Sequence, residues 1–123
     1  IQADGGTRTA SITGGFVALV LALEKMRKRK MIDQLPVKDY IAAVSVGMVE
    51  NSLLLDLKYD EDSNAQMDMN VVMLAQGDFV EVQGTAEKGT FSKKQMDSLL
   101  DLAKKGIKEL MKIQRKILSG IKV

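Results

Sequence analysis

The feature that most constrains this chain is its last long segment, FSKKQMDSLLDLAKKGIKELMKIQRKIL, residues 91–118. Ser92 and Gln95 match the capping box that begins many helices. The apolar residues that follow recur at helical spacing; they are Met96, Leu99, Leu100, Ala103, Ile107, Leu110, Met111 and Ile117. A helix with one apolar face must bury that face, so the segment predicts a second layer beneath it.

Four short apolar segments bounded by turn residues can supply that layer as strands. They are YIAAVSVGMV (40–49), SLLLDLKY (52–59), MDMNVVML (67–74) and FVEVQGTA (79–86). Glu50–Asn51 and Gln76–Asp78 are expected to be the hairpin turns, and the polar run DEDSNAQ (60–66) a further turn. The strands therefore predict two consecutive hairpins.

A second helix is expected near the start of the chain, from about Thr7 to Met26. Its centre, FVALVLAL, is apolar on every side, which predicts burial on most faces. Gly14 and Gly15 each cost such a helix about 1 kcal/mol relative to Ala, so we expect them to allow a close approach of a neighbouring backbone. Ile1–Gln2 is typical of the end of a strand.

This order of elements predicts an α+β fold, a single domain over residues 1–123 in which two helices cover a four-stranded, mostly antiparallel sheet. The longest apolar run, Phe16 to Leu23, is shorter than the ~18 residues of a membrane span, so no membrane partner is expected. Cysteine is absent, which fits a cytoplasmic protein and excludes disulfides and thiolate metal sites.

The chain also contains no histidine. Histidine is the commonest general base and the commonest ligand of transition metals. A Ser-His-Asp or Cys-His mechanism therefore cannot be built from this chain alone. Catalysis here would have to use carboxylates, lysines, arginines, hydroxyls or a hard metal ion.

The turn before the first helix, DGGTR (4–8), combines the features of an anion site. The first turn of a helix presents unpaired N–H groups and partial positive charge, and glycine lets an anion approach the backbone. Thr7 adds a hydroxyl donor and Arg8 a planar guanidinium suited to phosphate. The segment matches neither the P-loop nor the dinucleotide-binding pattern. From the pattern alone, a simple strand-to-helix turn with Thr7 as N-cap and Arg8 in solvent remains the alternative.

Five carboxylates fall within thirteen residues, and this density suits a hard divalent cation such as Mg²⁺. They are Asp56, Asp60, Glu61, Asp62 and Asp68. In a straight strand Asp62 and Asp68 would lie roughly 20 Å apart, so they can cooperate only if the chain bends near Ser63–Asn64. Asp68 and Asn70 then share one face of the next strand. An acidic, solvated loop is the alternative.

Two basic runs could contact phosphates. One is KMRKRK (25–30), with five cations in six residues, and the other is the polar face of the last helix, including Lys112 and Lys116. No aromatic residue lies among these cations to stack on bases. We therefore interpret both runs as solvated surface.

Together and in this order, several segments resemble the ribonuclease PH family. They are QADGGTRTASITG, AAVSVG, LLDLKYDEDSNAQMDMNVVM, and EVQGTAE followed by FS. The resemblance covers nearly all of the 123 residues and implies the fold named after ribosomal protein S5 domain 2. A full family member is about twice as long, so we expect this chain to be the C-terminal half, with apolar surface exposed where the N-terminal half is absent.

The resemblance implies phosphorolysis of RNA, with tRNA precursors as the expected substrate and inorganic phosphate as co-substrate. Gly6, Thr7 and Arg8 match the positions that hold the phosphate, and Asp62 and Asp68 match the acidic pair assigned to Mg²⁺ binding and proton transfer. It also implies a hexameric ring of dimers in the parent protein, with this chain alone inactive.

A non-catalytic structural or RNA-binding subunit of an exosome-like ring is the alternative within the same resemblance. Such a relative would usually lack at least one of Arg8, Asp62 and Asp68, and all three are present. The sequence therefore favours the enzyme over the inert subunit.

Overall fold

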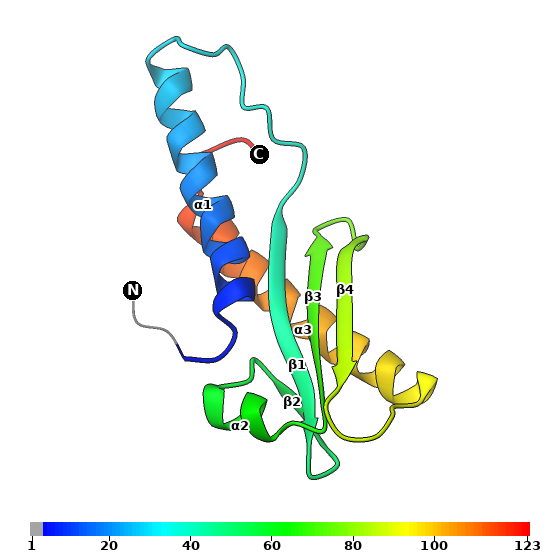
Figure 1. The fold of residues 1–123 in the computed structure, drawn as a ribbon. Helices are drawn as coiled ribbons and strands as arrows, with labels where there is room; N and C mark the ends of the chain where they lie inside the picture. The colour runs from blue at the N-terminus through cyan, green and yellow to red at the C-terminus, as the bar shows by residue number, and fades with distance from the viewer. Residues whose placement is uncertain (1–3) are drawn as a thin grey trace.

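The computed structural model describes residues 4–123 and contains one four-stranded sheet with strand order β2-β1-β3-β4 (Figure 1). All neighbouring strands in it are antiparallel. The elements are α1 (Thr7–Lys28), β1 (Ile41–Val49), β2 (Ser52–Leu55), α2 (Tyr59–Asn64), β3 (Met67–Leu74), β4 (Phe79–Ala86) and α3 (Lys93–Ile117). The predicted α+β fold is confirmed, while the strand expected at Ile1–Gln2 lies outside the described residues.

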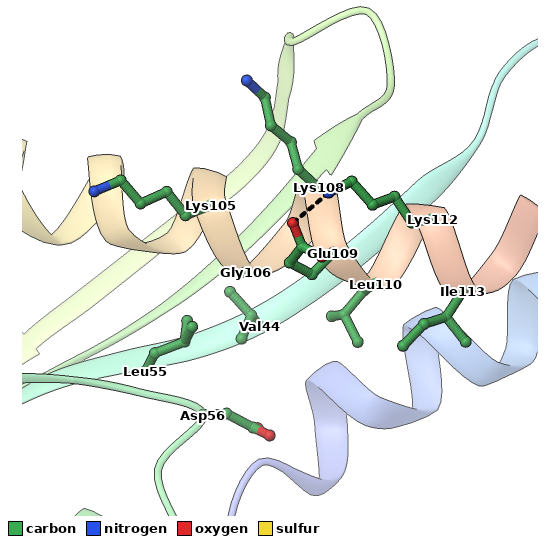
Figure 2. Close-up of a pocket in the computed structure, with 10 residues that line it drawn as sticks. All are labelled: Val44, Leu55, Asp56, Lys105, Gly106, Lys108, Glu109, Leu110, Lys112 and Ile113. Carbon is green, nitrogen blue, oxygen red and sulfur yellow. Dashed lines mark hydrogen bonds and ion pairs between the residues drawn. The ribbon is translucent and has the colours of Figure 1, made fainter.

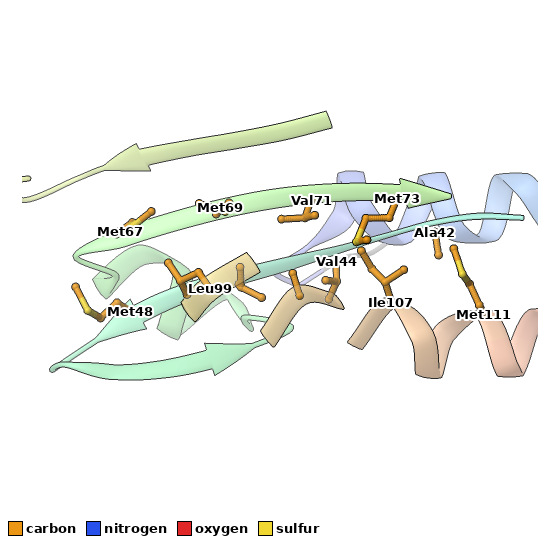
Figure 3. Packing of buried hydrophobic residues seen from close by; sticks show 12 residues of the cluster. Ala42, Val44, Met48, Met67, Met69, Val71, Met73, Leu99, Ile107 and Met111 are labelled. Carbon is orange, nitrogen blue, oxygen red and sulfur yellow. The ribbon is translucent and has the colours of Figure 1, made fainter. Parts of the chain in front are cut away.

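The long helix α3 covers one face of the sheet, as its apolar face predicted (Figures 1 and 3). It begins at the predicted capping box, in which the Gln95 backbone N–H donates to the Ser92 hydroxyl at 3.2 Å. Its buried residues pack against alternate residues of β1 and β3; these are Leu99, Ala103, Ile107 and Met111 from α3, Ala42, Val44, Val46 and Met48 from β1, and Met67, Met69, Val71 and Met73 from β3. The core is aliphatic and rich in methionine, which fills irregular gaps well.

Helix α1 covers the edge of β1 that faces β2, along the part of that edge that β2 is too short to reach. β2 pairs only with Val46–Val49. Farther along β1, the backbone N–H of Ala43 donates to Thr13 Oγ1 at 3.0 Å, and that hydroxyl donates to the Ala43 carbonyl at 3.2 Å. Gln114 of α3 joins both elements, because its Nε2 donates to the carbonyls of Thr13 and Ile41. Side chains thus replace the strand partner along this edge.

The prediction that α1 would be buried on most faces is wrong for the described chain. Only one stripe of the helix is buried, formed by Thr9, Phe16, Val20 and Glu24. No described atom would lie within 4 Å of a Cβ added to Gly14 or Gly15, so their predicted close approach to a backbone is also wrong here. The remaining apolar residues of α1 are not part of this buried stripe.

Strand β2, which pairs with β1 in the first hairpin, is shorter than predicted, and a helix forms in the polar run after it. Asp56 has a positive φ of 59°, which ends β2 at Leu55 instead of Tyr59. The six-residue helix α2 then replaces the predicted turn. Asp60, Glu61 and Asp62 occupy its first turn, where negative side chains favour helix formation through the helix dipole.

Among the described helices, only α1 is both long enough and apolar enough to cross a membrane. It has 22 residues and a window of mean hydropathy 1.3, although its longest unbroken apolar run is short. A helix from the core of a water-soluble protein meets the same criteria, and α1 makes specific hydrogen bonds to β1. The absence of a membrane partner stays a prediction.

Candidate functional site

The face of the sheet opposite α3 carries the polar residues of the candidate site. The antiparallel register places Asp68 beside Gly47 of β1 and Thr85 of β4, and Asn70 beside Ser45 and Gln83. The period of two along β3 puts its methionines on the α3 face and Asp68 and Asn70 on the other. The predicted shared face of Asp68 and Asn70 is therefore confirmed.

The segment between β2 and α2 folds over this polar face and brings Asp62 toward Asp68. The side chain of Leu57 is buried against Gly47, the register partner of Asp68. The backbone N–H of Leu57 donates to the buried Ser45 hydroxyl at 3.2 Å. Helix α2 follows at once and then leads into β3, so it supplies the bend that the two aspartates require.

The surroundings of Asp68 favour its protonated form. Partial burial is the main cause that raises the pKa of Asp68, and the negative charges of Asp62 and Glu87 raise it further. A carboxyl group with a raised pKa keeps its proton to a higher pH, which suits a proton donor. Asp62 itself is exposed on α2.

The turn before α1 packs directly onto the segment that leads into α2. The Asp4 carboxylate accepts a hydrogen bond from the Tyr59 backbone N–H at 2.9 Å. A Cβ on Gly5 would overlap the Leu57 carbonyl oxygen and lie 2.7 Å from the carbonyl carbon of Lys58, so only glycine fits there. Gly6 is the N-cap with φ 66°, a left-handed conformation that favours glycine. The predicted anion turn and the acidic pair are thus parts of one packed unit.

Thr7 and Arg8 occupy the first turn of α1, where Arg8 is half exposed, as the simple-turn alternative expects, but Thr7 is not the N-cap. Gly6, rather than Thr7, is the N-cap, and the Thr7 hydroxyl donates to the Asp4 carbonyl at 3.2 Å. Arg8 Nη2 donates to Glu81 Oε2 of β4 at 2.6 Å. This hydrogen bond is the main cause that lowers the pKa of Glu81 and raises that of Arg8. The arginine is therefore turned toward the sheet.

The side chains at this site that could bind a cation are carboxylates. Within residues 4–123 no cluster of three or more Asp, Glu, His or Cys side chains is arranged to hold a metal ion. Mg²⁺ commonly uses only one or two protein carboxylates and completes its shell with water and substrate phosphates. The negative charge of Asp62, which helps to raise the pKa of Asp68, fits such a partial site, since a bound cation would offset that charge.

A hollow of about 540 Å³ lies between α3 and the strands β1 and β2 (Figure 2). Val44, Leu55 and Leu110 give it an apolar lining, while Lys105 and Lys108 extend away from it. Asp56 also lines it, whereas Gly6, Thr7, Arg8, Asp62 and Asp68 do not. Asp56 Oδ1 would lie 3.5 Å from a Cβ on Gly6, so the hollow borders the turn that begins α1.

Sequence reasoning missed two carboxylates near the site, Glu81 and Glu87. Both lie within EVQGTAE, a segment quoted for the resemblance without a role for either residue. For Glu81 the signal was its place in an alternating strand, on the same face as Gln83 and Thr85. Its partner, Arg8, is 73 residues away, so only the fold reveals the pair.

Comparison with known families supports the resemblance stated above. Residues 39–106 match the family described as 3′ exoribonuclease family, domain 2. This match covers β1 to the middle of α3 and includes Asp62 and Asp68. The turn that holds Gly6, Thr7 and Arg8 precedes it.

Curated relatives extend the match to almost the whole chain. Ribonuclease PH of Bacillus pumilus (strain SAFR-032) is 59% identical over 118 residues, which are 95% of this chain and 49% of that protein. Ribonuclease PH of Syntrophomonas wolfei is 57% identical over 118 residues, 96% of this chain and 49% of that protein. The chain thus spans about half the length of the curated relatives it matches.

Among solved structures, rice (Oryza sativa) Rrp46 has a similar fold. The TM-score is 0.77 at 17% sequence identity, and the match covers 96% of this chain and 50% of Rrp46. At this identity the likeness concerns the fold alone.

Proposed function

Because this chain belongs to the 3′ exoribonuclease family, we propose that the full-length protein shortens RNA from its 3′ end by phosphorolysis. The full-length protein is one that carries these 123 residues within a chain of the relatives' length. The observation that carries the proposal is the packing of Gly5 against Leu57–Tyr59, because it joins the phosphate-binding turn to the acidic pair. Phosphate and the RNA end could then meet at one end of the polar face.

In the proposed reaction, an oxygen of inorganic phosphate attacks the phosphorus of the terminal phosphodiester. A new P–O bond forms, the bond to the 3′ oxygen of the preceding nucleotide breaks, and that oxygen takes up a proton. The terminal nucleotide leaves as a nucleoside diphosphate, and the RNA is one nucleotide shorter. No redox step or covalent enzyme intermediate is needed, which agrees with a site that has neither histidine nor cysteine.

We assign the residues as follows. Gly6, Thr7 and Arg8 hold the attacking phosphate through backbone N–H groups, a hydroxyl and a guanidinium. Asp62 and Asp68 would hold Mg²⁺ and serve the proton transfer, and without a bound cation partial burial raises the pKa of Asp68. When bound, Mg²⁺ would supply positive charge against the oxygens of the two reacting anions.

The finer parts of the proposal follow the family resemblance. We propose tRNA precursor 3′ ends as the RNA substrate, a hexameric ring of dimers as the assembly, and a cytoplasmic location. The name Ribonuclease PH of the relatives supports RNA as the substrate class, and the absence of cysteine fits a cytoplasmic location. The presence of Arg8, Asp62 and Asp68 favours a catalytic protein over an inert ring subunit.

The test is an RNA shortening assay with the purified full-length protein, Mg²⁺ and end-labelled RNA, with and without inorganic phosphate. We expect shortening only with phosphate, and nucleoside diphosphates as the product. An Asp68→Asn variant should lose at least ~100-fold of the turnover, in line with the removal of a general acid. Shortening without phosphate that releases monophosphates would mean a hydrolase and would contradict the proposal.

A further inference from the structure

Arg8 forms an ion pair with Glu81, which lies on a distant strand of the sheet. Arg8 lies in the first turn of α1, which contacts β1, whereas Glu81 lies on β4, two strands farther along the sheet. Glu81 is the register partner of Val72, which shares the polar face with Asn70 and Asp68. The two long side chains therefore meet above β3, the strand that carries Asp68.

Resting on the proposed function, we infer that Glu81 is a positioning residue for phosphate, acting through Arg8. Its carboxylate holds the guanidinium along the face of β3, the strand of Asp68. Val72 lies four positions from Asp68, about 13 Å along a strand, and Asn70 lies between them on the same face. A phosphate held by Arg8 and the first turn of α1 would thus lie on the side of the acidic pair.

The geometry of the contact leaves Arg8 able to bind a second anion. A guanidinium has five N–H donors, and the contact with Glu81 uses only Nη2. The remaining donors can take the oxygens of phosphate in the planar arrangement that arginine favours. Glu81 therefore holds one edge of the Arg8 guanidinium and leaves another edge to bind phosphate.

Two effects of Glu81 on phosphate binding oppose each other. Its negative charge repels phosphate, while its hydrogen bond removes rotational freedom that Arg8 would otherwise lose on binding. The side chains of Arg8 and Glu81 are 51% and 34% exposed, so solvent and salt screen the repulsion. Orientation is not screened, and holding a side chain in its bound conformation improves affinity. The positioning effect is therefore the larger one.

The experiment compares Glu81→Ala and Glu81→Gln with wild-type full-length protein. The measurements are the KM for inorganic phosphate, the KM for RNA, kcat, and phosphate affinity by titration calorimetry without RNA. Glu109→Ala is the matched control, because Glu109 is also in an exposed pair, with Lys112 at 2.6 Å, on α3. Arg8→Ala, alone and combined with Glu81→Ala, shows whether the effect passes through Arg8.

We expect Glu81→Ala to raise the KM for phosphate and its dissociation constant about five- to tenfold, the size expected when one long side chain must be ordered on binding. The KM for RNA should be unchanged. Glu81→Gln keeps an oxygen acceptor and should restore part of the loss. In the Arg8→Ala background, Glu81→Ala should have no further effect, and Glu109→Ala should resemble wild type.

Unchanged or tighter phosphate binding in Glu81→Ala would overturn the inference, and tighter binding would identify Glu81 as a competing counter-ion. The proposed function can fail separately. If wild-type protein shows no phosphate-dependent shortening but binds phosphate, the calorimetric comparison still decides the role of Glu81. If wild-type protein binds no phosphate at all, both the function and the positioning role are wrong.

Discussion

Gly5 and Leu57 are in backbone contact, with no room for a side chain between them. A Cβ on Gly5 would overlap the carbonyl oxygen of Leu57 and lie 2.9 Å from the backbone nitrogen of Tyr59. The contact joins the turn that begins α1 to the segment that begins α2. Arg8 and Asp62 follow directly on these two segments, so this approach, together with the Asp4–Tyr59 hydrogen bond, sets their relative placement.

Gly5→Ala should therefore separate the two segments. We expect a loss of about 1–3 kcal/mol in the free energy of unfolding, as for other overpacked sites, and a larger fractional loss of phosphate-dependent turnover. Urea unfolding and the RNA shortening assay measure the two effects. Gly14→Ala is the control, since a Cβ there meets no described atom and alanine favours a helix by about 1 kcal/mol. Wild-type stability and turnover in Gly5→Ala would show that the approach is not required.

Thr13 should contribute to stability through its hydroxyl rather than its size. Thr13→Val keeps the shape but removes both hydrogen bonds to Ala43, whose backbone groups have no strand partner in β2. We expect a loss of about 1–3 kcal/mol, the cost of leaving buried polar groups unpaired. The measurement is urea unfolding, with the exposed Thr90→Val as control. Equal stability of the two variants would mean that water replaces the hydroxyl.

Periodicity was sufficient to predict α3 and β3, each of which buries one regular face, and apolar segments bounded by turn residues were sufficient to predict the other strands and the two hairpins. Neither signal could predict the end of β2. Asp56 adopts a positive φ that residues other than glycine rarely take, and this choice depends on the burial of Leu57 over Gly47. The helix α2 had a usable signal in its acidic first turn, but six residues are too few for a helical pattern to be distinguished from a turn.

The candidate site was predictable where its residues are close in the sequence or share a strand. Asp68 and Asn70 share a face because side chains alternate along a strand. The partner of Arg8 was not predictable. Glu81 reaches the polar face only through the pairing of β3 with β4, and a register irregularity near Val72 and Met73 changes which β4 residues point there. The burial of α1 was overestimated because composition does not say which elements lie beside a helix.

Asp68→Asn should stabilise the folded protein at neutral pH. The pKa of Asp68 is raised in the folded state, so the folded state binds the proton more tightly than the unfolded state, and ionisation destabilises it. Stability from this group is fully present below its ordinary pKa of 3.8 and is lost as the pH rises through the raised value.

The measurement is urea unfolding of wild type and Asp68→Asn at about pH 3 and pH 7, either side of the titration, in buffer with a chelator so that no cation occupies the site. The amide introduced by Asp68→Asn cannot ionise. The free energy of unfolding of the variant should therefore exceed that of wild type at neutral pH but not in acid. Asp101→Asn, on the exposed side of α3, is the control. A variant that is equally or less stable at neutral pH would contradict the raised pKa.

The basic face of α3 should contribute little to RNA binding. Lys112 pairs with Glu109 at 2.6 Å, and both Lys112 and Lys116 are exposed on the side of the helix away from the sheet. The double variant Lys112→Ala, Lys116→Ala should change RNA affinity of the full-length protein less than about threefold and leave its salt dependence nearly unchanged. If these lysines contact phosphates, the slope of log affinity against log salt would fall by about one for each contact.

The 123-residue chain on its own should self-associate. Leu19 and Leu21 of α1 and Ile113 and Ile117 of α3 are about half exposed, and exposed apolar groups of this size favour association. Leu21→Glu combined with Ile113→Glu should shift the chain toward monomer without loss of helix content, because neither side chain is buried in the core. Light scattering coupled to size-exclusion chromatography measures the mass, and circular dichroism the helix content. A monomeric wild-type chain at high concentration would show that these side chains do not drive association, and a double variant that stays associated would place the contact elsewhere, with the exposed strand β4 the next surface to test.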